Sequence, residues 1–240
     1  MTAMPSPRRS LPRGRHRLSP EAVESDQRRR MLVAMVAALE EHGYARATVG
    51  HVVDLAGVSR RTFYEQFDDR EDCLLAAYDD AERRVWAQAA AAAAAAAPDW
   101  PHRIHAAVGA ALDFLAAEPA TGRLFTLEAR AAGEAIAERH RRALDRLAAL
   151  LRAGNRTSLD AADLPEQTER ILVANVAALA GSYVLSGATE LLPGLAPQLA
   201  DHLLLPYRDS ERSGDGEISP IAARGPTNGT SSANSSSGRS

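Results

Sequence analysis

The stretch TVGHVVDLAGVSRRTFYEQF, residues Thr48–Phe67, decides the fold of this chain. Its pattern predicts two short helices joined by a turn at Gly57. Thr48 and Ser59 are of the residue types that cap helix N-termini. A glycine in such a turn lets the second helix cross the first at a steep angle. We therefore predict a helix-turn-helix whose helices begin directly after Thr48 and Ser59.

The second of these helices has a core side and an exposed side when its residues are placed at about 100° intervals. Phe63 and Phe67 lie four residues apart and point together into the core. The outermost positions are Arg61 and Glu65. Together with the flanks, this side offers arginines, a phenol, a hydroxyl and an amide, which suit the phosphates and base edges of DNA. The candidate DNA-facing residues of this helix are Arg60, Arg61, Thr62, Tyr64 and Gln66.

Charge is divided unevenly along the 240 residues. All 28 basic residues are arginines and 31 residues are acidic, so the formal net charge is −3. Residues 1–67 hold eleven arginines against seven acidic residues, whereas residues 68–240 hold seventeen against twenty-four. A basic head on an acidic body indicates that the head binds a polyanion and that the body has another role.

The composition also excludes several classes of protein. With 45% apolar and 25% charged residues, it is typical of a soluble globular protein. The single cysteine, Cys73, excludes an intrachain disulfide and a thiolate metal cage. Apolar runs of about 18 residues are missing, and no apolar segment typical of a secretory signal follows the arginine-rich start. We expect no membrane partner and a cytoplasmic location.

The chain between its two ends is predicted to be all-α, because strand alternation is missing and Ala and Leu dominate. Residues 1–22 are expected to be a disordered basic arm, either a solvated tail or a DNA-contacting arm, and residues 210–240 a disordered Ser- and Gly-rich tail. The expected helices are Ser25–His42, Val49–Ala56, Arg60–Phe67, Asp69–Ala97, Pro101–Ala117, Thr121–Thr126, Leu127–Ala153 with Gly154 as its stop, Pro165–Ser186, and a last helix that follows Pro193 and Pro197 and ends near Tyr207.

The run GYARATVGHVVDLAGVSRRTFYEQFDDREDCLLAAYD, within Arg30–Asp79, resembles the DNA-binding domain of TetR-family transcriptional regulators. The similarity rests on Gly-Tyr before Ala-Thr-Val, the Ala-Gly-Val-Ser turn, the Thr-Phe-Tyr-x-x-Phe helix and the acidic start of the next helix. It covers about fifty residues. The resemblance implies an all-α fold, with a helix-turn-helix domain over residues 23–68 and a larger ligand-binding and dimerisation domain over residues 69–209.

The resemblance also implies roles for individual residues. Thr48 and Ser59 would cap the two helices and lie near phosphates, and Arg60, Arg61 and Thr62 would face the major groove. Tyr64, Gln66 and Arg70 would contact phosphates. Many relatives have a small residue where this chain has Arg61, so the arginine pair implies either guanine-containing half-sites or additional phosphate contact. The DNA-binding candidates are thus Thr48, Ser59, Arg60, Arg61, Thr62, Tyr64, Gln66 and Arg70.

The function that the resemblance implies is a ligand-released repressor that binds a pseudo-palindromic operator as a homodimer, with activation as the alternative sign. An apolar or aromatic small molecule is expected in the body, and its candidate contacts are Trp86, Phe114, Phe125, Glu128, Asn175 and Tyr183. We expect no catalytic residues, metal or cofactor. Two alternatives stay open: a helical enzyme, and a DNA-binding protein whose body binds a protein or only dimerises.

Overall fold

The computed structural model describes residues 19–128, 133–156 and 164–208, and these form helices and no strand, which confirms the all-α prediction. The elements are α1 (Pro20–His42), α2 (Val49–Ala56), α3 (Arg60–Tyr64), α4 (Arg70–Ala95), α5 (Trp100–Ala117), α6 (Pro119–Arg123), the π-helical turn η1 (Leu124–Glu128), α8 (Glu134–Arg156), α9 (Thr168–Ser186), the 3-10 turn η2 (Thr189–Leu191) and α10 (Leu192–Arg208).

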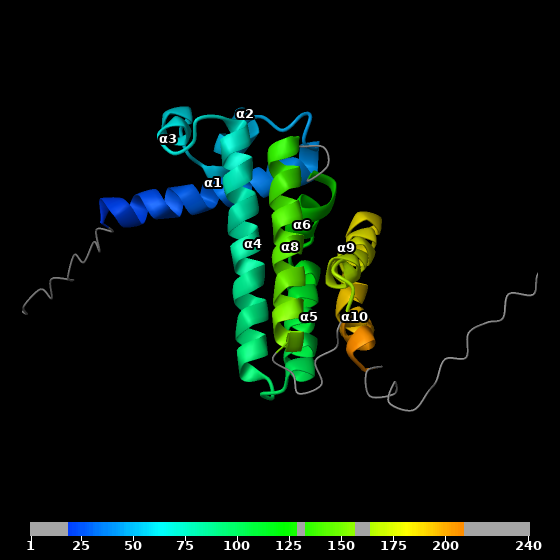
Figure 1. Ribbon diagram of the computed structural model, residues 1–240. Helices are drawn as coiled ribbons and strands as arrows, with labels where there is room; N and C mark the ends of the chain where they lie inside the picture. Colours follow the sequence, from blue (N-terminus) through cyan, green and yellow to red (C-terminus); the bar gives the residue numbers. More distant parts are fainter. Residues whose placement is uncertain (1–18, 129–132, 157–163, 209–240) are drawn as a thin grey trace, which may run out of the picture.

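The helices are arranged as a small head on a larger body (Figure 1). Helices α1, α2 and α3 make the head, and α1 lies across the upper end of the long helix α4. From the head, α4 runs down the body, where it packs against α5 and touches α8. Helix α10 packs on α5, and α9 packs on α8 and α10. Because α4 belongs to both parts, it is the direct connection between head and body.

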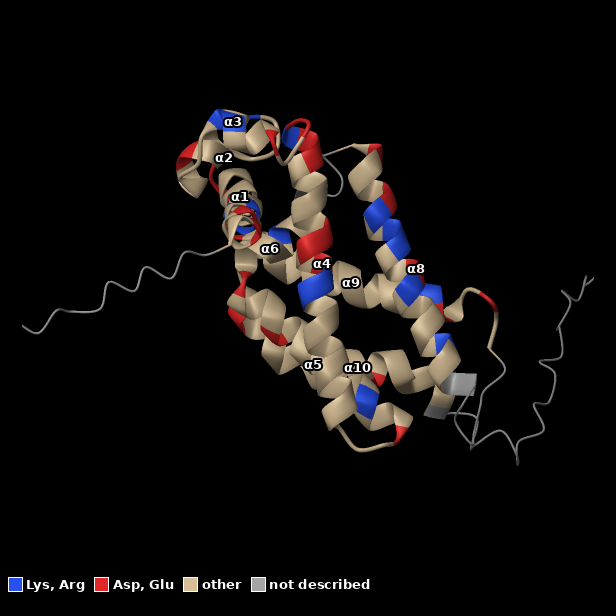
Figure 2. Ribbon diagram, turned by 90° about the vertical axis from the view of Figure 1, so that its left-hand side faces the viewer, with Lys and Arg blue, Asp and Glu red and all other residues tan. Residues whose placement is uncertain are grey.

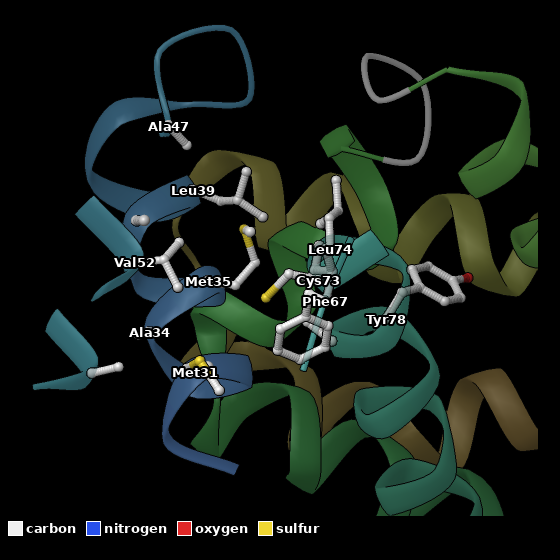
Figure 3. Close-up of a cluster of buried hydrophobic side chains, with 14 of the residues drawn as sticks. Met31, Ala34, Met35, Leu39, Ala47, Val52, Phe67, Cys73, Leu74 and Tyr78 are labelled. Atoms are coloured by element: carbon white, nitrogen blue, oxygen red, sulfur yellow. The ribbon is translucent and has the colours of Figure 1, made fainter. Parts of the chain in front are cut away.

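The core of the head continues into the body. Met31 and Met35 of α1 are fully buried together with Leu74 and Tyr78 of α4 (Figure 3). Phe63 of α3 is fully buried in the same cluster. Leu124 and Ile136 from the body belong to the same buried cluster. The first two turns of α4 are therefore held by side chains of both parts. We infer that head and body are packed as a continuous apolar unit at this junction.

Cys73 lies in this shared core with no exposed surface, and burial raises the pKa of its thiol to about 12. The thiolate is the reactive form of cysteine, so we expect folded protein at pH 8 to react with a thiol-modifying reagent far more slowly than protein in concentrated urea. Mass spectrometry of timed samples measures this ratio. Equal rates in the two solutions would show that the thiol is accessible.

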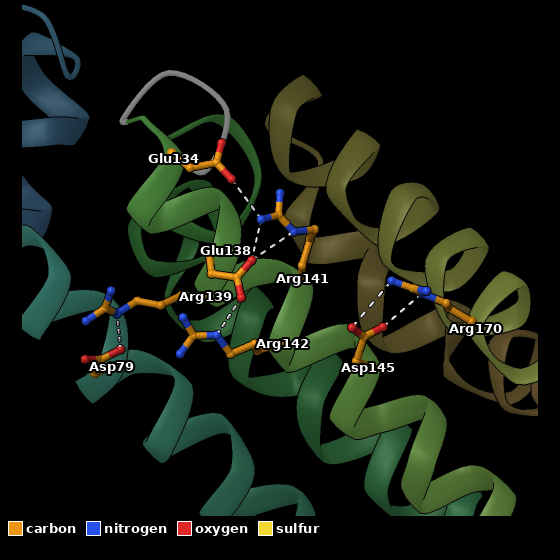
Figure 4. A network of polar contacts seen from close by, with 8 residues as sticks. All are labelled: Asp79, Glu134, Glu138, Arg139, Arg141, Arg142, Asp145 and Arg170. Carbon is orange, nitrogen blue, oxygen red and sulfur yellow. Dashed lines mark hydrogen bonds and ion pairs between the residues drawn. The ribbon is translucent and has the colours of Figure 1, made fainter.

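Ion pairs tie α8 to both of its neighbours (Figure 4). Arg139 Nε donates to Asp79 Oδ1 of α4 at 2.8 Å, and Arg170 Nε of α9 donates to Asp145 Oδ1 of α8 at 2.9 Å. On α8 itself, Glu138 accepts from Arg141 and Arg142. All of these groups are partly exposed, so each pair contributes little to stability. Only the pairs with Asp79 and Arg170 join α8 to neighbouring helices, α4 and α9 respectively.

Several expected helix boundaries are wrong. Helix α1 begins at Pro20 rather than Ser25, because Ser19 Oγ accepts from the Ala22 N–H and caps the helix. Helix α8 begins at Glu134 rather than Leu127. Residues 1–18 of the expected arm and all of the expected tail, 210–240, lie outside the described residues.

Glycine and proline positions explain three further errors, whereas α3 ends at Tyr64 rather than at Phe67 without either residue type nearby. Helix α8 passes through Gly154, where a Cβ atom would lie 1.9 Å from Trp100 Nε1, so this glycine permits close packing instead of ending the helix. Pro165 precedes α9, which begins at Thr168. Pro197 lies inside α10 and costs it one backbone hydrogen bond. Within the described ranges, no helix has the length and hydropathy needed to span a membrane.

Candidate nucleic-acid interface

Both predicted caps of the helix-turn-helix are present. Thr48 Oγ1 accepts from the His51 N–H at 3.3 Å at the start of α2. Ser59 Oγ accepts from the Thr62 N–H at 3.0 Å at the start of α3. Each cap satisfies one of the N–H groups that a helix start leaves without an intrahelical partner. The two caps therefore fix where both helices of the motif begin.

The turn between α2 and α3 requires a glycine. Gly57 has φ 63° and ψ 41°, the left-handed conformation that residues with a Cβ atom rarely adopt. From α1, Arg30 Nη1 donates to the Ala56 carbonyl at 2.8 Å. A cation at a helix C-terminus is favourable, so Arg30 stabilises the end of α2 directly before the turn.

The recognition helix α3 presents the sides that the helical wheel predicts. Phe63 and Phe67 are buried, with ring centroids 5.4 Å apart. Opposite them, the Arg61 side chain is 89% exposed and its Nε donates to Glu65 Oε1 at 2.9 Å. Tyr64 is 56% exposed, and Arg60 is exposed as well. The arginines are therefore available to a partner, and their DNA contact remains a prediction.

Arg60 reaches back to the start of α2. Its Nη2 lies 3.3 Å from the position that a Cβ atom on Gly50 would occupy, and Thr48 Oγ1 lies 3.4 Å from the same position. The guanidinium and the N-terminus of α2 thus share one side of the head. Figure 2 shows the arginines of α3 as blue segments at the upper end of the molecule.

Thr62 and Gln66 are half-buried and engaged within the head. Thr62 Oγ1 and Ser59 Oγ are 2.9 Å apart. Gln66 Nε2 donates to Glu24 Oε1 of α1 at 2.7 Å, and Arg28 Nη1 donates to the Gln66 carbonyl at 3.0 Å. These contacts attach the end of α3 to α1.

Arg70 is used to hold the loop between α1 and α2. Its Nη1 donates to the carbonyls of Tyr44 at 2.6 Å and Ala47 at 2.9 Å, and its guanidinium lies 4.4 Å from the centroid of the Tyr44 ring. The sequence analysis missed the positioning roles of Arg28, Arg30 and Arg70. The only signal for the first two was the run of three arginines in α1.

Comparison with known proteins identifies this part of the chain. Residues 32–77 match the family model described as "Bacterial regulatory proteins, tetR family". These residues form a tetR-family domain. The match covers the second half of α1, all of α2 and α3, and the start of α4, so the resemblance predicted from the sequence is confirmed. No curated protein matches the chain.

The fold of the tetR-type head and its body recurs in solved structures. The chain is 21% identical to the fatty acid degradation regulator FadR from Bacillus halodurans, with TM-score 0.65, over 73% of this chain and 97% of the other. For FadR from Bacillus subtilis in complex with stearoyl-CoA, identity is 17% and TM-score 0.64, over 73% and 96%. A putative TetR-family regulator from Syntrophomonas wolfei has 16% identity and TM-score 0.63, over 76% and 95%. At these identities the likeness establishes the fold.

The candidate ligand contacts in the body are not brought together around one site. Phe114 is buried under Arg84, whose Cζ lies 5.2 Å from the ring centroid, and Phe125 packs edge-on against Tyr78 in the core shared with the tetR-type head. Trp86 Nε1 donates to Glu82 Oε1, Asn175 is exposed, and Tyr183 packs against a separate apolar cluster around Val184. The side chain of Glu128 lies outside the described residues.

A small pocket lies where the tetR-type head meets the body. It has a volume of about 160 Å³ and is lined by Leu39, Glu40 and Gly43 of the α1 end and by Ala120, Arg123 and Leu124. Pockets for drug-sized ligands are about 300–1,000 Å³, so this pocket is too small for such a ligand. In residues 19–128, 133–156 and 164–208, no three His, Cys, Asp or Glu side chains gather as a metal site would need.

Proposed function

We propose that this protein is a DNA-binding transcriptional regulator of the TetR type that binds a pseudo-palindromic operator as a homodimer. The observation that carries the proposal is the exposed arginine pair, Arg60 and Arg61, on α3 of a tetR-family domain. This helix has an N-terminal cap, and its opposite side is buried in the core. Arginine reads guanine with two hydrogen bonds in the major groove. A dimer would place its two recognition helices in grooves one helical turn, or a small multiple of it, apart.

We assign fewer residues to DNA contact than the sequence alone suggests. Arg60 and Arg61 would reach the bases or phosphates, and Tyr64 would contact the backbone beside them. Thr48 and Ser59 would lie at phosphates next to helix N-termini. Gln66 and Arg70 donate hydrogen bonds to groups inside the head, so we propose that these two residues position it. Thr62 Oγ1 lies within hydrogen-bond distance of Ser59 Oγ.

The proposed dimer surface is the outer side of α9 and α10. Both helices expose large apolar side chains, and pairing of two protomers would remove these side chains from water. Ile171 is 57% exposed and Leu205 is 55% exposed. Leu179 and Leu185 of α9 are exposed as well, and so is Leu191 of the turn η2 between the two helices.

We propose that an apolar small molecule bound in the body releases the operator, so that the protein acts as a repressor in the cytoplasm. The support is the fold shared with a regulator solved in complex with stearoyl-CoA. A ligand that binds only the conformation in which the two heads of the dimer are spaced wrongly for the operator would lower the affinity for DNA. The dispersal of the candidate contacts over separate apolar clusters favours a second candidate, a body that binds a protein or only dimerises.

Arg61→Ala tests the proposal. We expect the substitution to weaken operator binding by about 1–3 kcal/mol and to relax specificity at one base position. The measurement selects fragments from a genomic pool with the wild-type protein and titrates the recovered site against both proteins at several salt concentrations. Arg83→Ala is the matched control, because Arg83 is also an exposed arginine paired with a carboxylate on its own helix. Equal losses on operator and random DNA would make Arg61 a phosphate contact, and no selected site at all would contradict the proposed function.

A further inference from the structure

A groove with an acidic lining runs between the N-terminal half of α1 and the recognition helix α3. It has a volume of about 840 Å³, and Ser19, Val23 and Gln27 of the α1 side face Thr62 and Glu65 across it. The charged side chains among its lining residues are Glu24 and Glu65, and both are carboxylates. The groove therefore has the wrong charge for DNA although it adjoins the face proposed to bind DNA.

The carboxylates of the groove are only partly compensated. Glu24 Oε1 accepts from the side-chain amide of Gln66 at 2.7 Å, and an amide carries no charge. Glu65 Oε1 accepts from Arg61 Nε at 2.9 Å, but Arg61 itself is almost fully exposed. Arg28 of α1 contacts the groove residue Gln66, because its Nη1 donates to the Gln66 carbonyl. An additional cation in the groove would find two carboxylates at its walls.

We propose that the groove binds the chain's own segment 8–17, RRSLPRGRHR, when no DNA is bound. This segment has five arginines, one histidine and no acidic residue. It is joined through Leu18 to Ser19, which itself lines the groove. The charge of the segment is opposite to that of the groove, and the covalent connection places the two next to each other. Tethering over so few residues gives an effective concentration in the millimolar range.

The segment is long enough to line the groove. The α1 residues on its wall extend from Ser19 to Gln27, which is about 12 Å at the rise of an α-helix. Ten residues span up to about 35 Å when extended. The proposal requires the chain to reverse its direction at Leu18, directly before the N-cap Ser19 of α1. Val23, 40% exposed, offers apolar surface to the methylene groups of arginine side chains.

Docking of this segment has a consequence that rests on the proposed function. Phosphates and the groove carboxylates compete for the same arginines, so the docked segment lowers affinity for non-specific DNA. Sites that are bound tightly enough through α3 would still displace it. The docking itself does not depend on DNA and is tested without it.

The test places a nitroxide spin label on Ser10→Cys in the full-length chain. Cys73 is buried and stays unlabelled in folded protein. At low salt we expect an immobilised component in the electron paramagnetic resonance spectrum. It should fall at least about threefold in the double variant Glu24→Gln, Glu65→Gln, and also in 1 M salt, where the Debye length is about 3 Å. Glu40→Gln, Glu41→Gln on the far end of α1 is the matched control and should leave the component unchanged.

Two further samples keep the test decisive. Arg13→Gln, Arg15→Gln leaves the head untouched and should also mobilise the label, which covers the case in which the groove variant misfolds. Labelled chains mixed with excess unlabelled chains carrying the groove substitutions should keep the immobilised component, because each segment uses its own groove. A mobile label in every sample, equal immobilisation in groove variant and wild type, or loss of the component in the mixed sample would each overturn the proposal.

Discussion

Phe63→Ala is expected to lower the free energy of unfolding by about 3–5 kcal/mol, the usual range for truncating a buried phenylalanine. Phe63 has no exposed surface, and its ring contacts those of Phe67 and Tyr64, each at a centroid distance of 5.4 Å. Its loss would leave a cavity between α3, α1 and α4. Because the same buried cluster contains Leu124 and Ile136 of the body, we expect unfolding of head and body to be affected together. Urea denaturation followed by circular dichroism measures the change.

Tyr64→Ala is the matched control for this prediction. Tyr64 is the next residue and is also aromatic, but its side chain is mostly exposed. A surface substitution of this kind usually changes stability by no more than about 0.5 kcal/mol, while the proposed backbone contact to DNA would be lost. If both variants unfold at the same urea concentration, the assignment of core side and DNA side to α3 is wrong.

The head could be predicted from the sequence because its signals are local. Capping residues and turn glycines act within a few residues of where they stand, so Thr48, Ser59 and Gly57 fix the helix-turn-helix on their own. The spacing of Phe63 and Phe67 then decides which side of α3 is buried. Each of these inferences needs the geometry of a single helix or turn and no knowledge of distant residues.

The sequence carries little signal where a distant residue decides the local structure. Gly154 resembles a helix stop, but the approach of Trp100 from α5 explains it. Gln66 and Arg70 have the side chains of phosphate ligands, and the sequence does not show that Glu24, Tyr44 and Ala47 accept hydrogen bonds from them. Their contact with DNA stays a prediction. A ligand site in the body depends on which helices pack together. The identity of single residues on separate helices does not show which helices are neighbours. The candidate contacts accordingly lie in different parts of the body.

The ion pair between Arg152 of α8 and Glu169 of α9 leads to the second large effect, because its two partners differ in burial. The Glu169 side chain is 4% exposed, whereas that of Arg152 is 36% exposed. Arg152 Nη2 lies 3.1 Å from Glu169 Oε2 and also donates to the Glu166 carbonyl. The hydrogen bond that Arg152 donates to Glu169 raises the pKa of the arginine, so Arg152 stays charged at any pH of interest.

We expect Arg152→Ala to destabilise the protein more than Glu169→Gln does at pH 8, because it leaves a buried carboxylate without its cation. Glu169→Gln should cost less than about 1 kcal/mol, since the amide keeps the shape of the side chain and the arginine left behind reaches water. Urea denaturation at pH 8 separates the two cases. Equal costs for the two variants would mean that the buried charge of Glu169 is not what this contact compensates.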